Sequence, residues 1–136
     1  MKIFYKNVIS EVTKLGEDIR LFAKPYHLDE ETVYHLNLCL EELIGNIILY
    51  GFKDQKEHLI ELDIAYHGDP PQVTMRIKDD GIAFNPLRDA PCPPLGSSLA
   101  ERRQGGLGVY LVKKFMTTIL YAREEGCNVL KVTKCL

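Results

Sequence analysis

Glu42 and Asn46 are the first residues in this sequence whose types and spacing suggest chemistry. They are four residues apart in the stretch LCLEELIGNIILYGF, which otherwise resembles an apolar helix, so both side chains lie on one helical face. In a water-filled pocket, the amide oxygen of Asn46 could bind Mg²⁺, an ion that prefers oxygen ligands. The Glu42 carboxylate, one turn away, could accept a proton from a nucleophile. The alternative is that both side chains lie at the helix margin and contact bulk water.

A second polar group, Asp79-Asp80-Gly81, follows a predicted strand. On its own this group could be a strand end followed by turn residues. The functional interpretation makes Asp79 a buried acceptor for the exocyclic amine of a nucleobase, with Gly81 letting the base approach the backbone. Adenine presents an amine where guanine presents a carbonyl, so a buried carboxylate facing guanine would be left unpaired. Such a site would discriminate strongly against guanine.

The third group is Gly105-Gly106-Leu107-Gly108, directly before an amphipathic helical pattern. Glycines at a helix start expose backbone N–H groups, and the helix dipole attracts anions, so phosphate binding is one interpretation. A flexible loop end is the alternative. The segment is not a P-loop, because no Gly-Lys-Ser/Thr follows. It is not a Rossmann fingerprint either, because Leu111 stands where the third glycine is needed.

Periodicity predicts the elements that must position these groups. Apolar residues at helical spacing predict a helix over residues 8–23, ended by Pro25, and a second helix that begins after Asp29 and ends at Gly51. Alternating residues predict two hairpins, and a third helix follows the glycine-rich segment. The four strands are expected over residues 58–67, 73–78, 119–123 and 128–134. The buried side of the third helix is expected to carry Leu107, Leu111, Val112, Phe115 and Met116.

Composition narrows the classes of protein to consider. The 136 residues, 46% hydrophobic and 26% charged, suit one globular domain over residues 1–136. A net charge of −2 argues against binding that neutralises nucleic-acid phosphates. The N-terminus lacks signal-peptide features and no stretch is apolar enough for a membrane span, so a cytoplasmic protein without membrane contact is expected. The cysteines and histidines show no zinc-site spacing.

In chain order the three groups form E-x-x-x-N on a helix, D-x-G after a strand, and G-G-x-G at a helix start. The blocks read EELIGNIILYGF, KDDGIAFNP and GGLGVYLVKKFM. This combination resembles the GHKL ATPase superfamily, specifically its stand-alone anti-sigma-factor serine/threonine kinases, over about residues 8–134. The resemblance implies an α+β two-layer sandwich, in which a mixed or antiparallel sheet is covered by about three helices.

The resemblance also implies a role for each group. Asn46 would hold the Mg²⁺ that bridges the phosphates of ATP, and Glu42 would be the catalytic base. Asp79 and Gly81 would contact adenine, and the glycine-rich segment would bind phosphate beneath a lid over residues 83–104, a stretch in which prolines forbid regular structure. The implied cofactor-binding set is Asn46, Asp79, Gly81, Gly105, Gly106, Leu107, Gly108 and Asn128.

Three positions depart from the family pattern. Ala83 stands where many members have the second glycine of D-x-G-x-G, which could narrow or stiffen the lid hinge. Tyr50 stands where a histidine is frequent. The last strand often begins near a threonine, where this chain has Cys127-Asn128, and Asn128 could replace the hydroxyl contact.

The function implied is that of an anti-sigma-factor-type protein serine/threonine kinase, which binds Mg-ATP and phosphorylates or sequesters a protein partner. The expected partners are an anti-anti-sigma-like substrate and a sigma factor, and a homodimer is one expected assembly. Three alternatives stay open: a nucleotide-gated binding module without catalysis, a simple ATPase in which Glu42 activates water, and a globular domain that binds no nucleotide.

Overall fold

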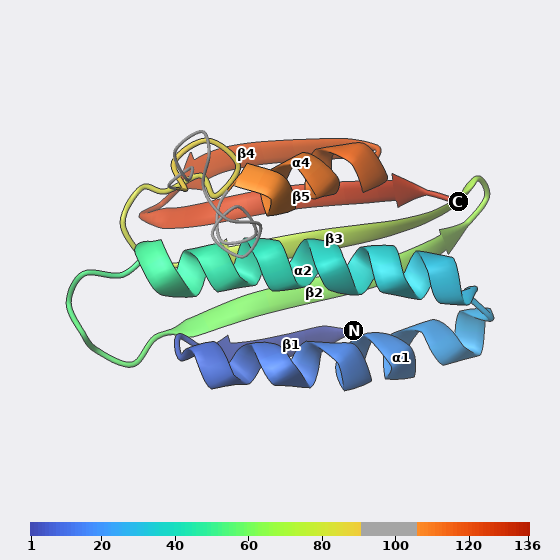
Figure 1. Ribbon diagram of the computed structural model, residues 1–136, viewed down its shortest axis with the longest axis horizontal. Helices are drawn as coiled ribbons and strands as arrows, with labels where there is room; N and C mark the ends of the chain where they lie inside the picture. Colours follow the sequence, from blue (N-terminus) through green and yellow to red (C-terminus); the bar gives the residue numbers. More distant parts are fainter. Residues whose placement is uncertain (91–105) are drawn as a thin grey trace.

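Helix α2 (Glu30–Tyr50) runs across the middle of the molecule in the computed structural model, which describes residues 1–90 and 106–136 (Figure 1). Its start is fixed as predicted, because the Asp29 side chain accepts a hydrogen bond from the Thr32 N–H at 2.7 Å. Its end is also as predicted, with the Gly51 N–H bonded to the Ile47 carbonyl at 2.8 Å. The expected apolar stripe is buried and includes Leu36, Leu40, Leu43 and Ile47.

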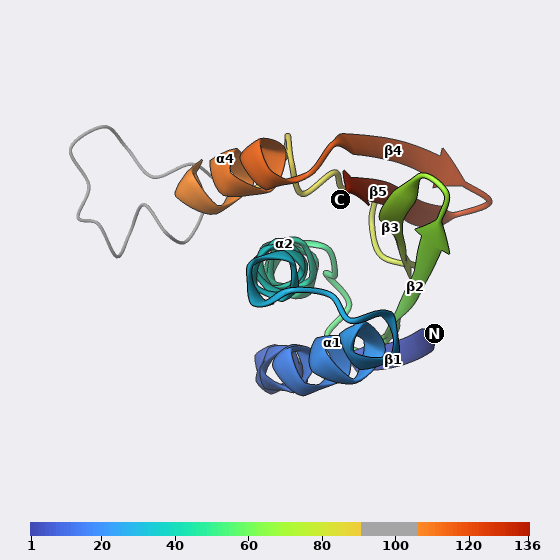
Figure 2. The ribbon, with the colours of Figure 1, turned by 90° about the vertical axis from the view of Figure 1, so that its right-hand side faces the viewer.

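A five-stranded sheet forms the second layer. Its strands are β1 (Lys2–Lys6), β2 (Leu59–Gly68), β3 (Pro71–Asp79), β4 (Thr118–Glu124) and β5 (Cys127–Cys135). All neighbouring strands are antiparallel, in the spatial order β1-β2-β3-β5-β4. Figure 2 shows the helices gathered on one side of this sheet. The predicted α+β sandwich and both predicted hairpins are therefore confirmed.

Two further α-helices, α1 (Leu15–Ala23) and α4 (Gly106–Phe115), flank α2 on either side (Figure 1). Leu15, Ile19 and Phe22 bury one side of α1, and Val112 is buried on α4. None of the helices in the described part of the chain is long and apolar enough to cross a lipid bilayer.

The predicted helix over residues 8–23 is wrong in its first half. Residues Ile9–Lys14 form a 3₁₀ helix, η1, that contains no buried residue, and a second short 3₁₀ turn, η2 (Lys24–Tyr26), follows α1. Val8, which was expected to begin the apolar side, is 49% exposed and has extended backbone angles. The apolar spacing continues through this segment, but the core begins only at Leu15, so packing supports the α-helix from there.

Strand β1 was missed by the sequence analysis. Among the described strands it pairs with β2 alone, at the edge of the sheet, and one face of this five-residue strand packs against the core. Tyr5 is its buried anchor: the Tyr5 hydroxyl donates to Oδ2 of Asp18 on α1 at 2.7 Å. So short a pattern carries too few alternations to be distinguished from a loop.

The sheet register places the end of β3 beside the start of β5. Asp79, the last residue of β3, is directly opposite Asn128, the second residue of β5. Two candidate site residues that are 49 positions apart in sequence are thereby brought into contact. The tight turn at Glu125 and Gly126, which have φ angles of 50° and 76°, joins β4 to β5 and sets the register of that pair of strands.

Candidate functional site

Asn46 occupies the core-facing side of α2 near its C-terminal end. The side chain is 4% exposed, and its amide nitrogen has no hydrogen-bond partner among the residues that the structure describes. This burial excludes the alternative that Asn46 contacts bulk water at the helix margin. A buried amide that lacks a partner costs free energy, so the group is suited to a ligand. Because rotation about χ2 exchanges the oxygen and nitrogen, the amide can present an acceptor there.

Glu42 lies one turn before Asn46 and contacts the start of α4. A Cβ atom placed on Gly108 would overlap the Glu42 carboxylate, so the two residues pack directly together. Burial raises the pKa of the Glu42 carboxyl above its usual range, and repulsion from Glu41 adds to this. The first and third sequence groups therefore meet at one point, where only a glycine fits.

Asp79 is also buried, with 3% of its surface exposed. Its Oδ1 accepts hydrogen bonds from the Gly81 N–H at 2.9 Å and from Asn128 Nδ2 at 3.0 Å. Burial raises the pKa of the Asp79 carboxyl, and these two hydrogen bonds and the charge of Arg123 oppose the rise. Both hydrogen bonds found within the described residues end on Oδ1, which leaves Oδ2 as the free acceptor.

Gly81 joins the end of β3 to the end of α2. Its own Cβ position would overlap the Gly51 carbonyl oxygen, and that oxygen accepts the Ile82 N–H at 2.9 Å. On the other side, Arg123 Nη1 donates to the Gly81 carbonyl at 2.8 Å. Residue 81 must be glycine because the contact leaves no room for a side chain. Backbone conformation is not the reason, since the φ angle of Gly81 lies outside the left-handed region.

The glycine-rich segment predicted to bind phosphate is only partly described. Gly105 and residues 91–104 of the predicted lid lie outside the described residues, as does the side chain of Leu107. Gly106 begins α4 and Gly108 is buried against Glu42, so the described part of the motif stands at a helix N-terminus as predicted. Residues 83–90 contain no helix or strand.

The three residues that depart from the family pattern have different surroundings in the structure. Ala83 is exposed, so its methyl group has room. The Tyr50 ring packs at a tilt against Phe84, with ring centroids 6.2 Å apart. Asn128 is 2% exposed and bonded to Asp79, Ile82, Phe84 and Tyr121 within the protein.

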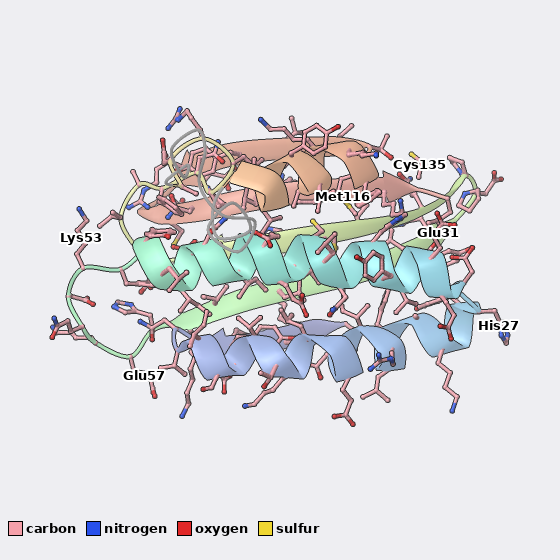
Figure 3. The ribbon with its side chains drawn as sticks, in the orientation of Figure 1. His27, Glu31, Lys53, Glu57, Met116 and Cys135 are labelled. Atoms are coloured by element: carbon pink, nitrogen blue, oxygen red, sulfur yellow. The ribbon has the colours of Figure 1, made fainter. Side chains whose placement is uncertain are left out.

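A cleft of about 470 Å³ adjoins the site at Gly81, which forms part of its lining. Asp79, Glu42 and Asn46 do not line this cleft. The loop from α2 to β2 forms one wall, and Lys53 and Glu57, labelled in Figure 3, mark this loop beyond the end of the helix. Its lining includes Phe52, His58, Asp80, Gly81, Ile82 and Arg123.

His58 bridges two carboxylates in this cleft. Its Nδ1 lies 2.8 Å from Asp80 Oδ1, and its Nε2 lies 2.8 Å from both carboxylate oxygens of Asp54. The ring stacks on Phe52 at 4.6 Å between centroids. A neutral imidazole has one N–H donor, so two carboxylate partners favour the protonated ring. The hydrogen bond to Asp54, with that to Asp80, raises the pKa of His58 against the opposing effect of burial.

The cluster of Asp54, His58 and Asp80 could not be predicted from local sequence patterns. Asp54 and His58 are four residues apart, and Asp80 belongs to a motif already noted, but no sequence rule brings the loop to the end of β3. Arg123 and Tyr121 lie on β4, and only the register of the sheet shows that they approach Gly81 and Asn128.

The helix–sheet sandwich, with buried polar groups where α2, β3 and α4 meet, is the arrangement of one class of ATPase domain. Residues 9–134 match the family model described as the histidine kinase-like ATPase domain, and the chain belongs to that family. The predicted resemblance is confirmed. Membership of an ATPase family identifies ATP as the nucleotide that such a domain uses.

The relatives of this chain include protein kinases. It is 32% identical over 100 residues to the serine/threonine-protein kinase BtrW of Bordetella bronchiseptica, covering 74% of this chain and 68% of that protein. It is 26% identical over 103 residues to the serine-protein kinase RsbW of Listeria innocua, covering 74% of this chain and 64% of RsbW, less than two thirds of its length. The solved structure of the blue-light-activated histidine kinase of Erythrobacter litoralis EL346 gives a TM-score of 0.60 at 14% identity, covering 93% of this chain and 41% of that one. That last likeness supports the fold.

Gly81→Ala should destabilise the protein by about 1–3 kcal/mol, because the new methyl group must displace a backbone carbonyl. The free energy of unfolding in urea measures this. Gly16→Ala on α1 is the matched control, since its nearest neighbours would lie 3.8 Å from the methyl group. The control should be stabilised by up to about 1 kcal/mol through helix propensity. Equal stability of Gly81→Ala and wild type would contradict the close approach.

The stability supplied by His58 should depend on pH. Its pKa is raised in the folded state, so its contribution is complete below the unfolded value of 6.5 and is lost as pH rises through the folded value. The difference in unfolding free energy between wild type and His58→Gln should therefore be larger at about pH 6 than at about pH 9. Asp54→Asn, which removes the largest cause of the shift, should flatten the profile. A difference that is the same at both pH values would show that His58 is not held as a cation.

Proposed function

We propose that this protein is a Mg-ATP-dependent serine/threonine protein kinase that phosphorylates a protein partner and binds it. The observation that carries the proposal is the contact of Glu42 with Gly108, one helical turn from the buried amide of Asn46. A half-buried carboxylate at this place can accept a proton from a nucleophile that approaches a phosphate bound at the start of α4. The similarity to BtrW and RsbW, both named as protein kinases, supports the same activity.

Asp79 is the proposed recognition group for adenine. Its Oδ1 is occupied by Gly81 and Asn128, which holds the carboxylate in one orientation and leaves Oδ2 for the exocyclic amine. Gly81 has no side chain to obstruct a base beside it. Guanine would present its carbonyl to this carboxylate and leave two acceptors facing each other, a costly arrangement in a buried site.

Asn46 is the proposed protein ligand of Mg²⁺. The residues present fit this ion: Asn46 is buried, rotation of its amide puts the oxygen where the nitrogen has no partner, and Mg²⁺ commonly takes one or two protein oxygens with phosphates and water completing the shell. The described residues contain no group of three or more His, Cys, Asp or Glu side chains that could hold a metal by themselves. When bound, the ion would neutralise charge on the phosphates during transfer.

The start of α4 is the proposed phosphate-binding element. The backbone amides of Gly106, Leu107 and Gly108 stand in the first turn, where the helix dipole also favours anions, and Gly105, which lies outside the described residues, belongs to the same proposed set. Along α2, Gly51 follows Glu42 by nine residues, which is ~14 Å at 1.5 Å per residue. An elongated ligand can therefore contact the Gly81 region at one end and the start of α4 at the other.

Glu42 is the proposed general base. It would accept the proton of a serine or threonine hydroxyl on the protein substrate as that oxygen attacks the terminal phosphate. Its raised pKa brings the carboxylate closer to the pH at which a base is most effective. An anti-anti-sigma-like protein is the proposed substrate, a sigma factor is the proposed sequestered partner, and a homodimer is the proposed assembly.

The nucleotide part of the proposal predicts that Mg-ATP raises the melting temperature of the wild-type protein, while Mg-GTP at the same concentration does not. Ligand at 100 times its Kd stabilises the folded state by about 2.7 kcal/mol. Asp79→Asn should weaken ATP binding by about 10- to 100-fold, through loss of a charge-assisted hydrogen bond. Asp80→Asn is the matched control, because the neighbouring Asp80 side chain is 61% exposed and contacts His58 instead. Equal shifts with ATP and GTP would rule out adenine recognition by Asp79.

The catalytic part predicts that Glu42→Gln binds Mg-ATP within about threefold of wild type but transfers γ-phosphate to the substrate at least about 100-fold more slowly. Gly108→Ala should show the same loss, because its methyl group displaces the flexible end of Glu42. Glu41→Gln alters an exposed carboxylate bonded to Asn37 and removes only the smaller cause of the raised Glu42 pKa, so it should transfer at close to the wild-type rate. The wild-type rate should fall on acidification at a pH above the ordinary glutamate pKa of 4.5.

Transfer of labelled phosphate to small proteins that co-purify with the chain measures these rates. Undiminished transfer by Glu42→Gln would remove Glu42 from the mechanism. ATP-dependent partner exchange without transfer would instead establish a nucleotide-gated binding module. Steady phosphate release without an acceptor protein would establish a simple ATPase.

A further inference from the structure

Asn128 has a buried amide group whose hydrogen-bonding capacity is fully used inside the protein. It lies at the start of β5 and is 2% exposed. An amide side chain offers two N–H donors and two acceptor positions on its oxygen. The structure supplies partners for all four, so no position is left for a ligand.

The two donors of Asn128 hold different parts of the site. Nδ2 donates to Asp79 Oδ1 at 3.0 Å and to the carbonyl of Ile82 at 2.6 Å. The first bond fixes the carboxylate at the end of β3. The second fixes the backbone immediately after Gly81, where the chain leaves the sheet.

The oxygen of Asn128 holds two further segments. Oδ1 accepts the Phe84 N–H at 3.1 Å and also accepts the Tyr121 hydroxyl on β4. These partners settle the orientation of the amide: exchanging oxygen and nitrogen would place N–H groups against the Phe84 N–H and an oxygen against Asp79 and Ile82. One side chain therefore joins the end of β3, residues 82–84, β4 and β5.

We propose that Asn128 is a positioning residue that fixes the Asp79 carboxylate and the Ile82–Phe84 backbone as one unit, and that it acts on nucleotide selectivity only through Asp79. This inference rests on the proposed adenine site. It differs from a direct contact between Asn128 and the nucleotide, which would require the amide to give up one of its four partners. A threonine could not span the same set, since its hydroxyl has one donor hydrogen for both Asp79 and Ile82.

The decisive experiment is a double-mutant cycle that uses two nucleotides as probes. ATP carries the exocyclic amine, and purine riboside triphosphate has hydrogen in its place. Their ratio of dissociation constants, measured calorimetrically with Mg²⁺ present, reports recognition of the amine. Asn128→Ala should lower the preference for ATP by about tenfold in the wild-type background. In an Asp79→Asn background, the same change should alter the ratio by less than about twofold.

A second measurement needs no nucleotide. The Phe84 amide proton should exchange with solvent at least about tenfold faster in Asn128→Ala than in wild type, because its acceptor is gone. Tyr121→Phe is the matched control: it removes one bond to Asn128 Oδ1 but leaves the donors to Asp79 and Ile82 in place. This variant should keep the ATP preference within about twofold.

Each outcome has a distinct meaning. An equal loss of preference on replacing Asn128 in both backgrounds would show direct nucleotide contact and overturn the proposal, as would unchanged exchange at Phe84. Failure of wild type to bind either nucleotide would overturn the proposed function and the selectivity role together, while the exchange measurement would still decide whether Asn128 holds residues 82–84. Should Asn128→Ala fail to fold, Asn128→Ser keeps one hydroxyl that cannot serve all four partners, and the same two measurements apply.

Discussion

Backbone contact between the end of α2 and the end of β3 is the constraint on which the site depends. The Gly51 carbonyl accepts the Ile82 N–H and occupies the space that a side chain at residue 81 would need. Both partners are backbone atoms, so neither can shift without moving the element to which it belongs. The helix that carries Glu42 and Asn46 is thus held in a fixed relation to the strand that ends at Asp79. Side-chain hydrogen bonds, such as those of Asp79, then orient individual groups on the helix and strand that this backbone contact holds together.

The buried polar side chains differ in how far hydrogen bonds compensate the free-energy cost of their burial. In the described part of the chain, the buried polar side chains are Asn46, Asp79 and Asn128, and each is a predicted site residue. Asp79 and Asn128 stabilise each other and the backbone after Gly81, so their burial is compensated. Asn46 has an amide nitrogen without such compensation among the described residues, and its desolvation cost must be offset by the apolar core around it. Among the three buried polar side chains, Asn46 is therefore the one whose burial the protein compensates least.

Most of the fold could be predicted from the sequence because caps, turns and apolar spacing are local signals. The Asp29 cap, the apolar stripe of α2 and both hairpins follow from spacing alone, and each is confirmed. Strand β1 was missed because an edge strand buries one face of few residues. The 3₁₀ segment at residues 9–14 was predicted as α-helix because periodicity does not report where the core begins.

For the candidate site, the sequence predicted the residues but not the contacts between them. Motif order located Glu42, Asn46, Asp79 and the glycines, but their functional roles stay predictions. The pairing of Asp79 with Asn128 depends on strand register, which no local signal encoded. The interpretation of Asn128 as a replacement for a hydroxyl contact did not anticipate its four partners, because three of them lie on β4 or in the segment after Gly81.

The contact between Glu42 and Gly108 links the position of the proposed general base to the packing of the core. Glycine within the first turn of α4 weakens a ten-residue helix by about 1 kcal/mol relative to alanine, and a helix of this length is marginal alone. Its position must therefore come from tertiary contacts, which Val112 and Met116 make from the buried side of the helix and the residue that follows it. Since those residues share one core with α2, a shift in their packing would move Gly108 relative to Glu42. The placement of the carboxylate is in this sense a property of the whole helix layer, and a change far from the site can alter it.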